Sequence, residues 1–198
     1  MIEVLLVLLT VAAFQVGEYL GLKAVFIATA AVFWVTYVLV RWRRDPGVLR
    51  EWGFRSENLL PATAAGVAVL AVVGGAMFYV QWLRGPLWLP RNFWVTLALY
   101  PLWGIVQQFL LNGIIARNLA RRLPPAAAVL CAAVLFAVAH APDGALMGLT
   151  FVAGCVWVPI YLRWRNLWPL GVCHGLLGAL AYYVLLGRDV WLELTATW

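Results

Sequence analysis

Long, unbroken apolar runs constrain this chain more than any other feature of its sequence. Most of them approach the roughly 20 residues that a transmembrane helix needs. A membrane β-strand would instead alternate apolar and polar residues over about 10 positions. The sequence therefore predicts an all-α fold, a polytopic transmembrane helical bundle of about seven spans, with six to eight as the range. The runs cover Val4–Leu22, Ala24–Val40, Pro61–Val80, Phe93–Ala116, Ala126–Ala139, Leu146–Leu162 and Trp168–Leu186.

The composition excludes an ordinary soluble enzyme. Hydrophobic residues make up 65% of the chain and charged residues 11%, against about 45–50% and about 25% in soluble domains. The spans and their short connections use up the whole length, so residues 1–198 are predicted to form a single membrane domain. The first run has neither a basic segment before it nor a small-residue cleavage site after it, which favours a retained span over a signal peptide.

The cations predict the orientation of the chain. If three of the connections share one side of the membrane, ten cations lie there: Arg41, Arg43, Arg44, Arg50, Arg55, Arg117, Arg121, Arg122, Arg163 and Arg165. The other side holds four: Lys23, Arg84, Arg91 and Arg188. The positive-inside rule then places the N-terminus in the cytoplasm, and the style of the sequence suggests a bacterial-type plasma (inner) membrane. Because the arginines sit at the ends of apolar runs, they indicate bilayer contact and not nucleic-acid binding.

Polar side chains inside the runs are the candidates for function. Polar groups at bilayer depth are costly unless they are paired or face a wet cavity. At helical spacing, Gly104, Gln108 and Asn112 share one face, with Gln107 beside it. Depths counted from the helix ends are compatible with one cavity that also receives His140 and His174. Hydrogen bonds between helices remain the simpler explanation of the amides.

Three polar segments follow one another along the chain: Gln107-Gln108-Phe-Leu-Leu-Asn112, Phe136-Ala-Val-Ala-His140 and His174-Gly-Leu-Leu-Gly178. In order and spacing they resemble the motifs of the CPBP intramembrane proteases, also called the CAAX prenyl protease or ABI family, which includes proteins like the lysostaphin-resistance protein. The family pattern is Glu-Glu-x-x-x-Arg, Phe-x-x-x-His and His-x-x-x-Asn. The resemblance covers about residues 50–186, and three further segments add to it: Trp52-Gly-Phe-Arg55, His140-Ala-Pro-Asp143 and Asn166-Leu-Trp-Pro169.

The resemblance implies an intramembrane endopeptidase in which the first Glu activates water and the His and Asn residues hold the water or the oxyanion. This chain departs from the pattern at the groups that matter most. Gln107 and Gln108 replace the two Glu, Asn112 replaces the Arg and Gly178 replaces the Asn. An amide cannot act as a base near neutral pH, although it orients water by hydrogen bonds. We therefore expect a catalytically impaired protein. The positions that match the family's catalytic motifs are Gln107, Gln108, Asn112, His140 and His174.

Two hypotheses of different class follow from the sequence. One is an impaired endopeptidase that acts on membrane-associated peptides or proteins. The other is a non-enzymatic pseudoprotease that binds or protects a membrane partner. A transporter or structural protein with a chance motif match is a weaker third reading, as are catalytic roles for Glu18 or Asp143. No cofactor is expected, and no metal, because zinc usually takes three or four protein ligands and the carboxylates are missing.

Overall fold

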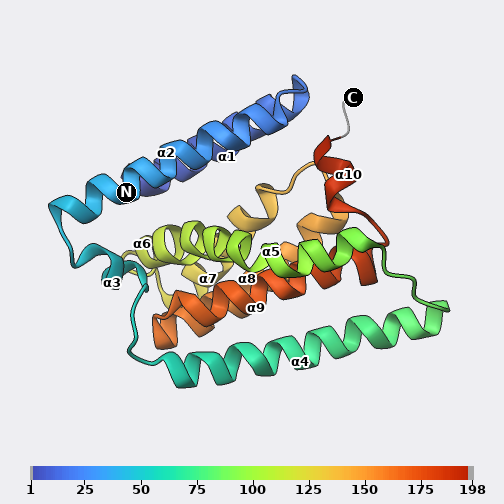
Figure 1. The fold of residues 1–198 in the computed structure, drawn as a ribbon. Coiled ribbons are helices and arrows are strands. Elements are labelled where there is room, and N and C mark those ends of the chain that lie inside the picture. The colour runs from blue at the N-terminus through green and yellow to red at the C-terminus, as the bar shows by residue number, and fades with distance from the viewer. Residues whose placement is uncertain (1, 196–198) are drawn as a thin grey trace. The chain divides into compact units, whose positions relative to one another are not determined.

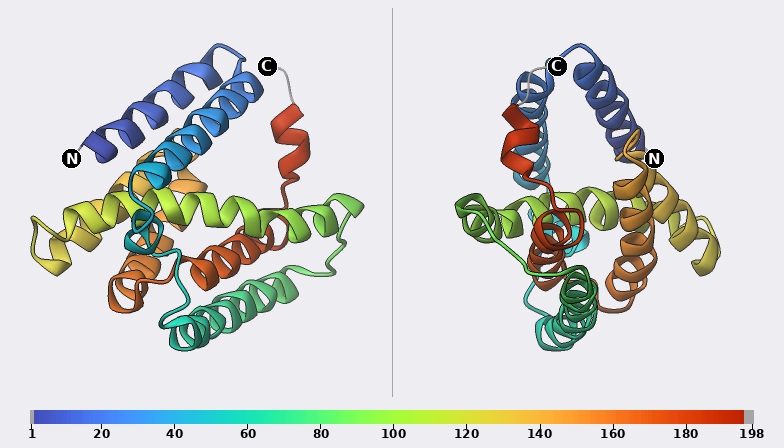
Figure 2. Two further views of the ribbon diagram at one scale, coloured as in Figure 1. Left: turned by 60° about the vertical axis from the view of Figure 1, so that its left-hand side comes forward. Right: turned by 90° about the vertical axis from the view of Figure 1, so that its right-hand side faces the viewer.

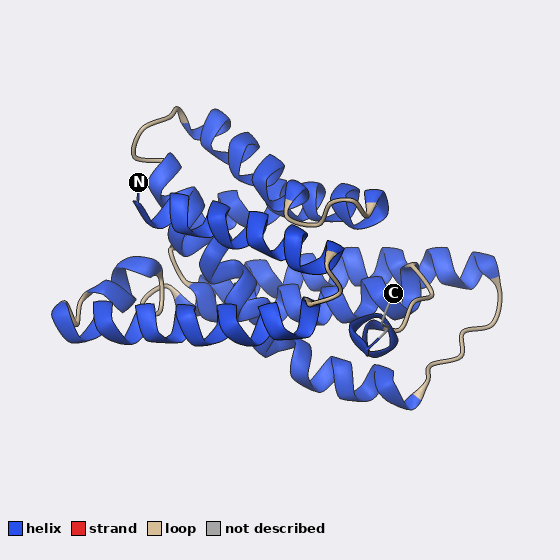
Figure 3. Cartoon of the chain, turned by 90° about the horizontal axis from the view of Figure 1, so that it is seen from above, coloured by secondary structure: helices blue, strands red, loops and turns tan. Residues whose placement is uncertain are grey.

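The computed structural model describes residues 2–195, and in that range Figure 3 shows helices joined by loops, without strands. Six helical stretches are long and apolar enough to cross a membrane: Ile2–Tyr19, Val25–Arg44, Leu59–Arg84, Arg91–Leu119, Gly144–Trp164 and Leu167–Leu185. A seventh apolar helix, Pro125–Val138, has 14 residues and is shorter than a span. The predicted polytopic helical bundle is confirmed, while the side on which the N-terminus lies stays a prediction.

The chain folds as two compact units that alternate along the sequence. The first unit contains residues 2–54 and 110–165, and the second contains residues 55–109 and 166–195. The single membrane domain predicted for residues 1–198 therefore stays a prediction.

The first unit begins with an antiparallel hairpin of α1 (Ile2–Tyr19) and α2 (Lys23–Arg44), which Figure 2 shows side by side. Gly21 forms the turn with a φ of 70°, in the left-handed region that glycine adopts without strain. Two hydrogen bonds join the helices: Trp34 Nε1 donates to Thr10 Oγ1 at 3.3 Å, and Tyr37 Oη donates to Glu3 Oε1 at 2.9 Å. Apolar side chains cover much of the exposed surface of both helices, as lipid contact requires.

A short helix, α3 (Val48–Trp52), forms in the polar stretch between the second and third apolar runs. Asp45 Oδ1 accepts a hydrogen bond from the Gly47 amide at 3.0 Å, which sets the turn before the helix. Gly53 ends it at a φ of 108°. The side chains of Val48 and Trp52 are buried, so burial of two apolar residues stabilises a helix too short to persist alone.

The rest of the first unit is the end of η1 (Phe109–Ala116), α6 (Arg117–Leu119), α7 (Pro125–Val138) and α8 (Gly144–Trp164). α7 and α8 pack closely because Gly154 lies against Ala133. An added Cβ on Gly154 would stand 2.7 Å from the Ala133 Cα. α1 runs alongside the segment from α6 to the end of α7. Near its start Glu3 accepts a hydrogen bond from Asn118, and farther along Gln15 donates one to the Ala139 carbonyl.

In the second unit, α9 (Leu167–Leu180) lies between α5 (Arg91–Gln108) and α4 (Leu59–Arg84), as Figure 1 shows. Asn166 caps α9: its Oδ1 accepts a hydrogen bond from the Trp168 amide at 3.1 Å. The same side chain donates to the carbonyls of Arg55 and Glu57, which fixes the start of α9 to the segment before α4. α9 continues as η2 (Ala181–Leu185), and α10 (Val190–Thr195) follows.

Candidate functional site

Three glycines let α5 and α9 touch backbone to backbone in the second unit. A Cβ on Gly104 would lie 2.2 Å from the Gly171 carbonyl oxygen and 2.6 Å from the Gly175 nitrogen. A Cβ on Gly175 would lie 2.3 Å from the Tyr100 carbonyl oxygen. Residues later in α5 therefore face residues earlier in α9, so the two helices are antiparallel. This contact fixes the register of the two helices, and it thereby sets the positions of the polar side chains about one turn away.

Gln107 and His174 meet next to this contact. His174 Nε2 and Gln107 Oε1 are 3.1 Å apart. A carbonyl oxygen only accepts hydrogen bonds, so Nε2 carries the proton and donates it to the amide. His174 is 8% exposed, and the amide thereby holds the imidazole in one tautomer and one orientation. The structure thus joins two of the sequence-predicted site residues by a hydrogen bond within the second unit.

Gln108 and Asn112 are both fully buried, but the chain changes its helix type between them. α5 ends at Gln108, and η1 continues as a π-helix from Phe109. Hydrogen bonds in a π-helix close on i+5, and such segments occur frequently at functional sites. Gly104 is buried as well, so all three residues that were predicted to share one face point away from the surface. Because the helix type changes after Gln108, the shared face beyond that residue stays a prediction.

His140 lies in the first unit, in the turn after α7. Its Nδ1 is 2.8 Å from the Phe136 carbonyl oxygen, and the two rings meet edge to face with centroids 5.1 Å apart. Because the carbonyl only accepts, Nδ1 carries the proton and Nε2 of the neutral ring keeps its lone pair. Burial lowers the pKa of His140 below its usual 6.5, against the opposing effects of the Phe136 carbonyl and Asp143. His140 is therefore neutral at pH 7 and its Nε2 accepts hydrogen bonds.

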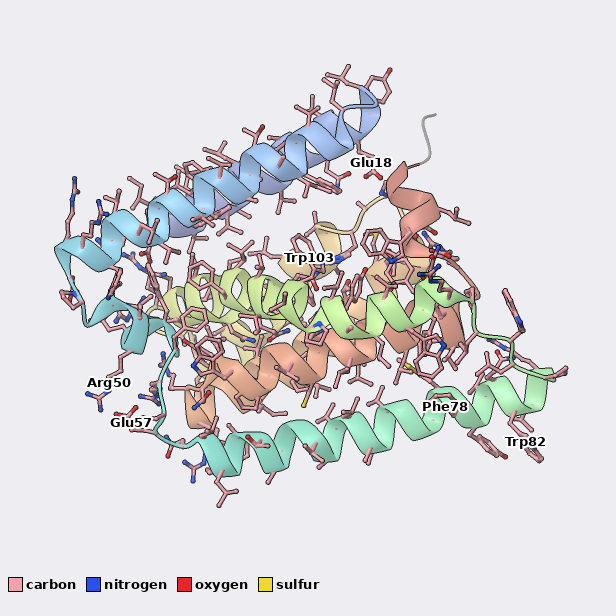
Figure 4. All side chains as sticks on the ribbon, in the orientation of Figure 1. Glu18, Arg50, Glu57, Phe78, Trp82 and Trp103 are labelled. Atoms are coloured by element: carbon pink, nitrogen blue, oxygen red, sulfur yellow. The ribbon has the colours of Figure 1, made fainter. Side chains whose placement is uncertain are left out.

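Asp143 has a structural role beside His140. Its Oδ1 accepts a hydrogen bond from the Leu146 amide at 3.0 Å and caps the start of α8. An N-cap carboxylate of this kind satisfies an amide that the helix itself leaves without a carbonyl. The other carboxylate weighed from the sequence, Glu18, lies on α1 near its C-terminal end (Figure 4).

A tyrosine covers the glycine that stands at the family's Asn position. A Cβ on Gly178 would lie 3.2 Å from both Cδ1 and Cε1 of Tyr100. The ring of Tyr100 also meets that of Tyr182 edge to face, with centroids 6.1 Å apart. Sequence reasoning missed Tyr100. Its position four residues before Gly104, on the face of α5 that packs on α9, was the signal that could have found it.

An apolar groove of about 320 Å³ runs beside the His174 segment, between α4 and α9. Its lining residues are Leu59, Thr63, Val67, Leu70, Trp168, Pro169, Val172, Cys173 and Leu176. Within residues 2–195 no group of three or more His, Cys, Asp or Glu side chains is arranged to hold a metal ion. At Gln107 and His174 the polar groups are an amide and an imidazole, both of which can form hydrogen bonds to water or to a peptide.

These features define an integral membrane protein in which a half-buried amide, Gln107, and a buried imidazole, His174, pair on two closely packed antiparallel helices. A family model, Rce1-like, of type II CAAX prenyl endopeptidases, matches residues 89–180, a little under half of the chain. The predicted resemblance to the CPBP family of intramembrane proteases is confirmed by this match, which spans all three motifs. Neither the curated proteins nor the solved structures gave a match.

Proposed function

We propose that this protein is a CAAX-protease-like membrane protein that acts on membrane-associated peptides or proteins and is catalytically impaired. The hydrogen bond from His174 Nε2 to Gln107 Oε1 is the observation that carries the proposal. In the family, the position of Gln107 belongs to the Glu that activates water. Here an amide takes that position and uses its oxygen to hold the histidine.

Without the family's carboxylates, this site can still orient a water molecule by hydrogen bonds, but it has no carboxylate to take a proton from that water. Amides donate and accept hydrogen bonds but do not take a proton from water near neutral pH. General-base catalysis typically contributes about 10²- to 10⁴-fold to a rate, so its loss leaves slow turnover at most. Among the residues at motif positions, His140 has the chemistry closest to that of the missing base, because its ring is neutral and its Nε2 accepts hydrogen bonds.

The apolar groove beside Cys173 supports a lipid-associated substrate or partner. It opens between α4 and α9, along helices with exposed apolar side chains. A hydrocarbon chain attached to a peptide is attracted into such a groove by the hydrophobic effect. The location we propose is a bacterial-type plasma (inner) membrane.

The test is cleavage of prenylated and plain membrane peptides by the purified full chain. The wild-type protein is compared with the variant Gln107→Glu/Gln108→Glu/Asn112→Arg, which restores the family's charged groups. We expect cleavage by the restored variant and little or none by the wild type. Addition of His174→Ala to the restored variant should abolish cleavage. Efficient cleavage by the wild type would overturn the proposed impairment.

A pseudoprotease that only binds a membrane partner is the second candidate function. The packing of Tyr100 over Gly178 favours it, because an Asn side chain at position 178 would need the tyrosine ring to move. A photo-crosslinkable prenylated peptide distinguishes the two functions. Crosslinking to α9 by the wild type, with no cleavage by either the wild type or the restored variant, would favour binding alone. Cleavage by the restored variant would favour an impaired enzyme.

A further inference from the structure

The short helix α3 brings several helix ends of the first unit together. The Trp52 carbonyl accepts a hydrogen bond from Tyr161 Oη, near the end of α8, at 2.8 Å. Glu51 forms an ion pair with the buried Arg117 at the start of α6. α3 itself follows the end of α2 after a three-residue turn. The ends of α2 and α8 and the start of α6 therefore lie around α3, at one end of this unit.

Exposed arginines concentrate at that end. Figure 4 shows Arg50 projecting outward from α3. We call the following set the basic end: Arg43, Arg44, Arg50, Arg121, Arg122 and Arg163. Two exposed carboxylates lie in the same region, and each has a partner within the chain. Asp45 accepts a hydrogen bond from the Gly47 amide, and Glu51 pairs with Arg117. The basic end thus presents a strong excess of positive charge.

The basic end borders apolar surface that faces lipid. On α2, the exposed side chains of Leu39, Val40 and Trp42 immediately precede Arg43. A tryptophan and arginines at the end of an apolar helix mark the depth of the lipid headgroups, where an indole and a guanidinium are both favourable. The phosphates of anionic lipids therefore lie at the same depth as the guanidinium groups. Guanidinium and phosphate also match in geometry, because two parallel hydrogen bonds can form between them.

We propose that the basic end of the first unit is a binding surface for anionic phospholipid headgroups. The occupant is the bilayer lipid itself and not an acidic protein, because the cations lie at the border of the lipid-facing surface on more than one helix. Headgroup binding there enriches anionic lipid around the chain and holds the ends of α2 and α8 at the membrane surface. The inference does not depend on whether the protein cleaves peptides.

The experiment measures lipid selectivity of the full chain in phosphatidylcholine bilayers. Spin-labelled phosphatidylglycerol and spin-labelled phosphatidylcholine are compared by electron paramagnetic resonance for their association with the protein. We expect a several-fold preference for phosphatidylglycerol that falls as salt is raised toward roughly 0.5 M, where the screening length drops to a few ångströms. The variant Arg43→Gln/Arg44→Gln/Arg121→Gln/Arg122→Gln should lose most of the preference, since it removes four of the six cations of the basic end.

Two matched controls separate charge from folding. The fourfold substitution to Lys keeps the charge and should retain most of the preference. Arg91→Gln removes an exposed cation at the start of α5 and should leave the preference intact. All three variants should show the same thermal unfolding as the wild type, followed by tryptophan fluorescence. Equal association of the two lipids, or an unchanged preference in the fourfold Gln variant, overturns the proposal. Binding of a soluble acidic peptide without any phosphatidylglycerol preference would also overturn it and assign the surface to a protein partner.

Discussion

Replacement of Gly104 by Ala tests the close contact between α5 and α9, next to which the Gln107–His174 pair lies. The added Cβ would meet three backbone atoms of Gly171 and Gly175 at 2.2 to 2.8 Å. Backbone atoms cannot rotate aside as side chains do, so we take the upper end of the overpacking range, about 3 kcal/mol. The higher helix propensity of Ala returns roughly 1 kcal/mol. The expected net loss is about 2 kcal/mol, or a fall in Tm of roughly 4–8 °C for a chain of this size.

Gly75→Ala is the matched control for this prediction. Gly75 lies in the interior of α4, and a Cβ built there meets nothing within 4 Å. Its substitution should be neutral or slightly stabilising, because only helix propensity changes. The assay is thermal unfolding of both variants in the same detergent, followed by intrinsic tryptophan fluorescence. If Gly104→Ala unfolds at the same temperature as Gly75→Ala, the close contact does not exist in the protein and the reasoning fails.

Three further outcomes follow from the packing and the polar contacts. Gly154→Ala should destabilise the first unit by about 1–3 kcal/mol, because its Cβ would overlap Ala133, and a thermal melt measures this. Burial alone would raise the pKa of Asp189, but hydrogen bonds, chiefly from Tyr183, hold it below the usual 3.8. The associated stability should be present above pH 3.8 and be lost as the pH falls through the lower folded pKa, as acid titration of unfolding can show. Tyr183→Phe should move that acid transition to higher pH and leave the melting at pH 7 only slightly lowered.

The sequence predicts the membrane helices well because apolar length is a local property. Each of the seven runs lies largely within observed helix, and the helices extend by a few residues into flanking polar positions. The predicted shortness of the fifth run is also borne out by the 14 residues of α7. α3 is different. It depends on burial of Val48 and Trp52 and on an ion pair with Arg117, and no local pattern reveals those contacts.

The candidate site is predictable only in part. The order and spacing of the motifs single out Gln107 and His174, which the structure joins by a hydrogen bond. The π-helix after Gln108 is not predictable, because it breaks the α-helical period without a Pro or Gly at the break. The position of Tyr100 over Gly178 depends on how α5 crosses α9. That crossing cannot be predicted from the sequence of either helix alone. The catalytic roles of all these residues stay predictions.

The central claim is that Gln107 stands where the family has its base and that this substitution impairs catalysis, and one ratio tests it most directly. The initial rate of cleavage of a prenylated membrane peptide is measured for Gln107→Glu and for the wild type, with Gln107→Met as the control for shape. A carboxylate placed beside His174 should raise the rate by roughly 100-fold or more, the range of general-base catalysis. Gln107→Met should stay at or below the wild-type rate. A measurable wild-type rate as high as that of Gln107→Glu would contradict the account, because the amide site would then already be a working protease.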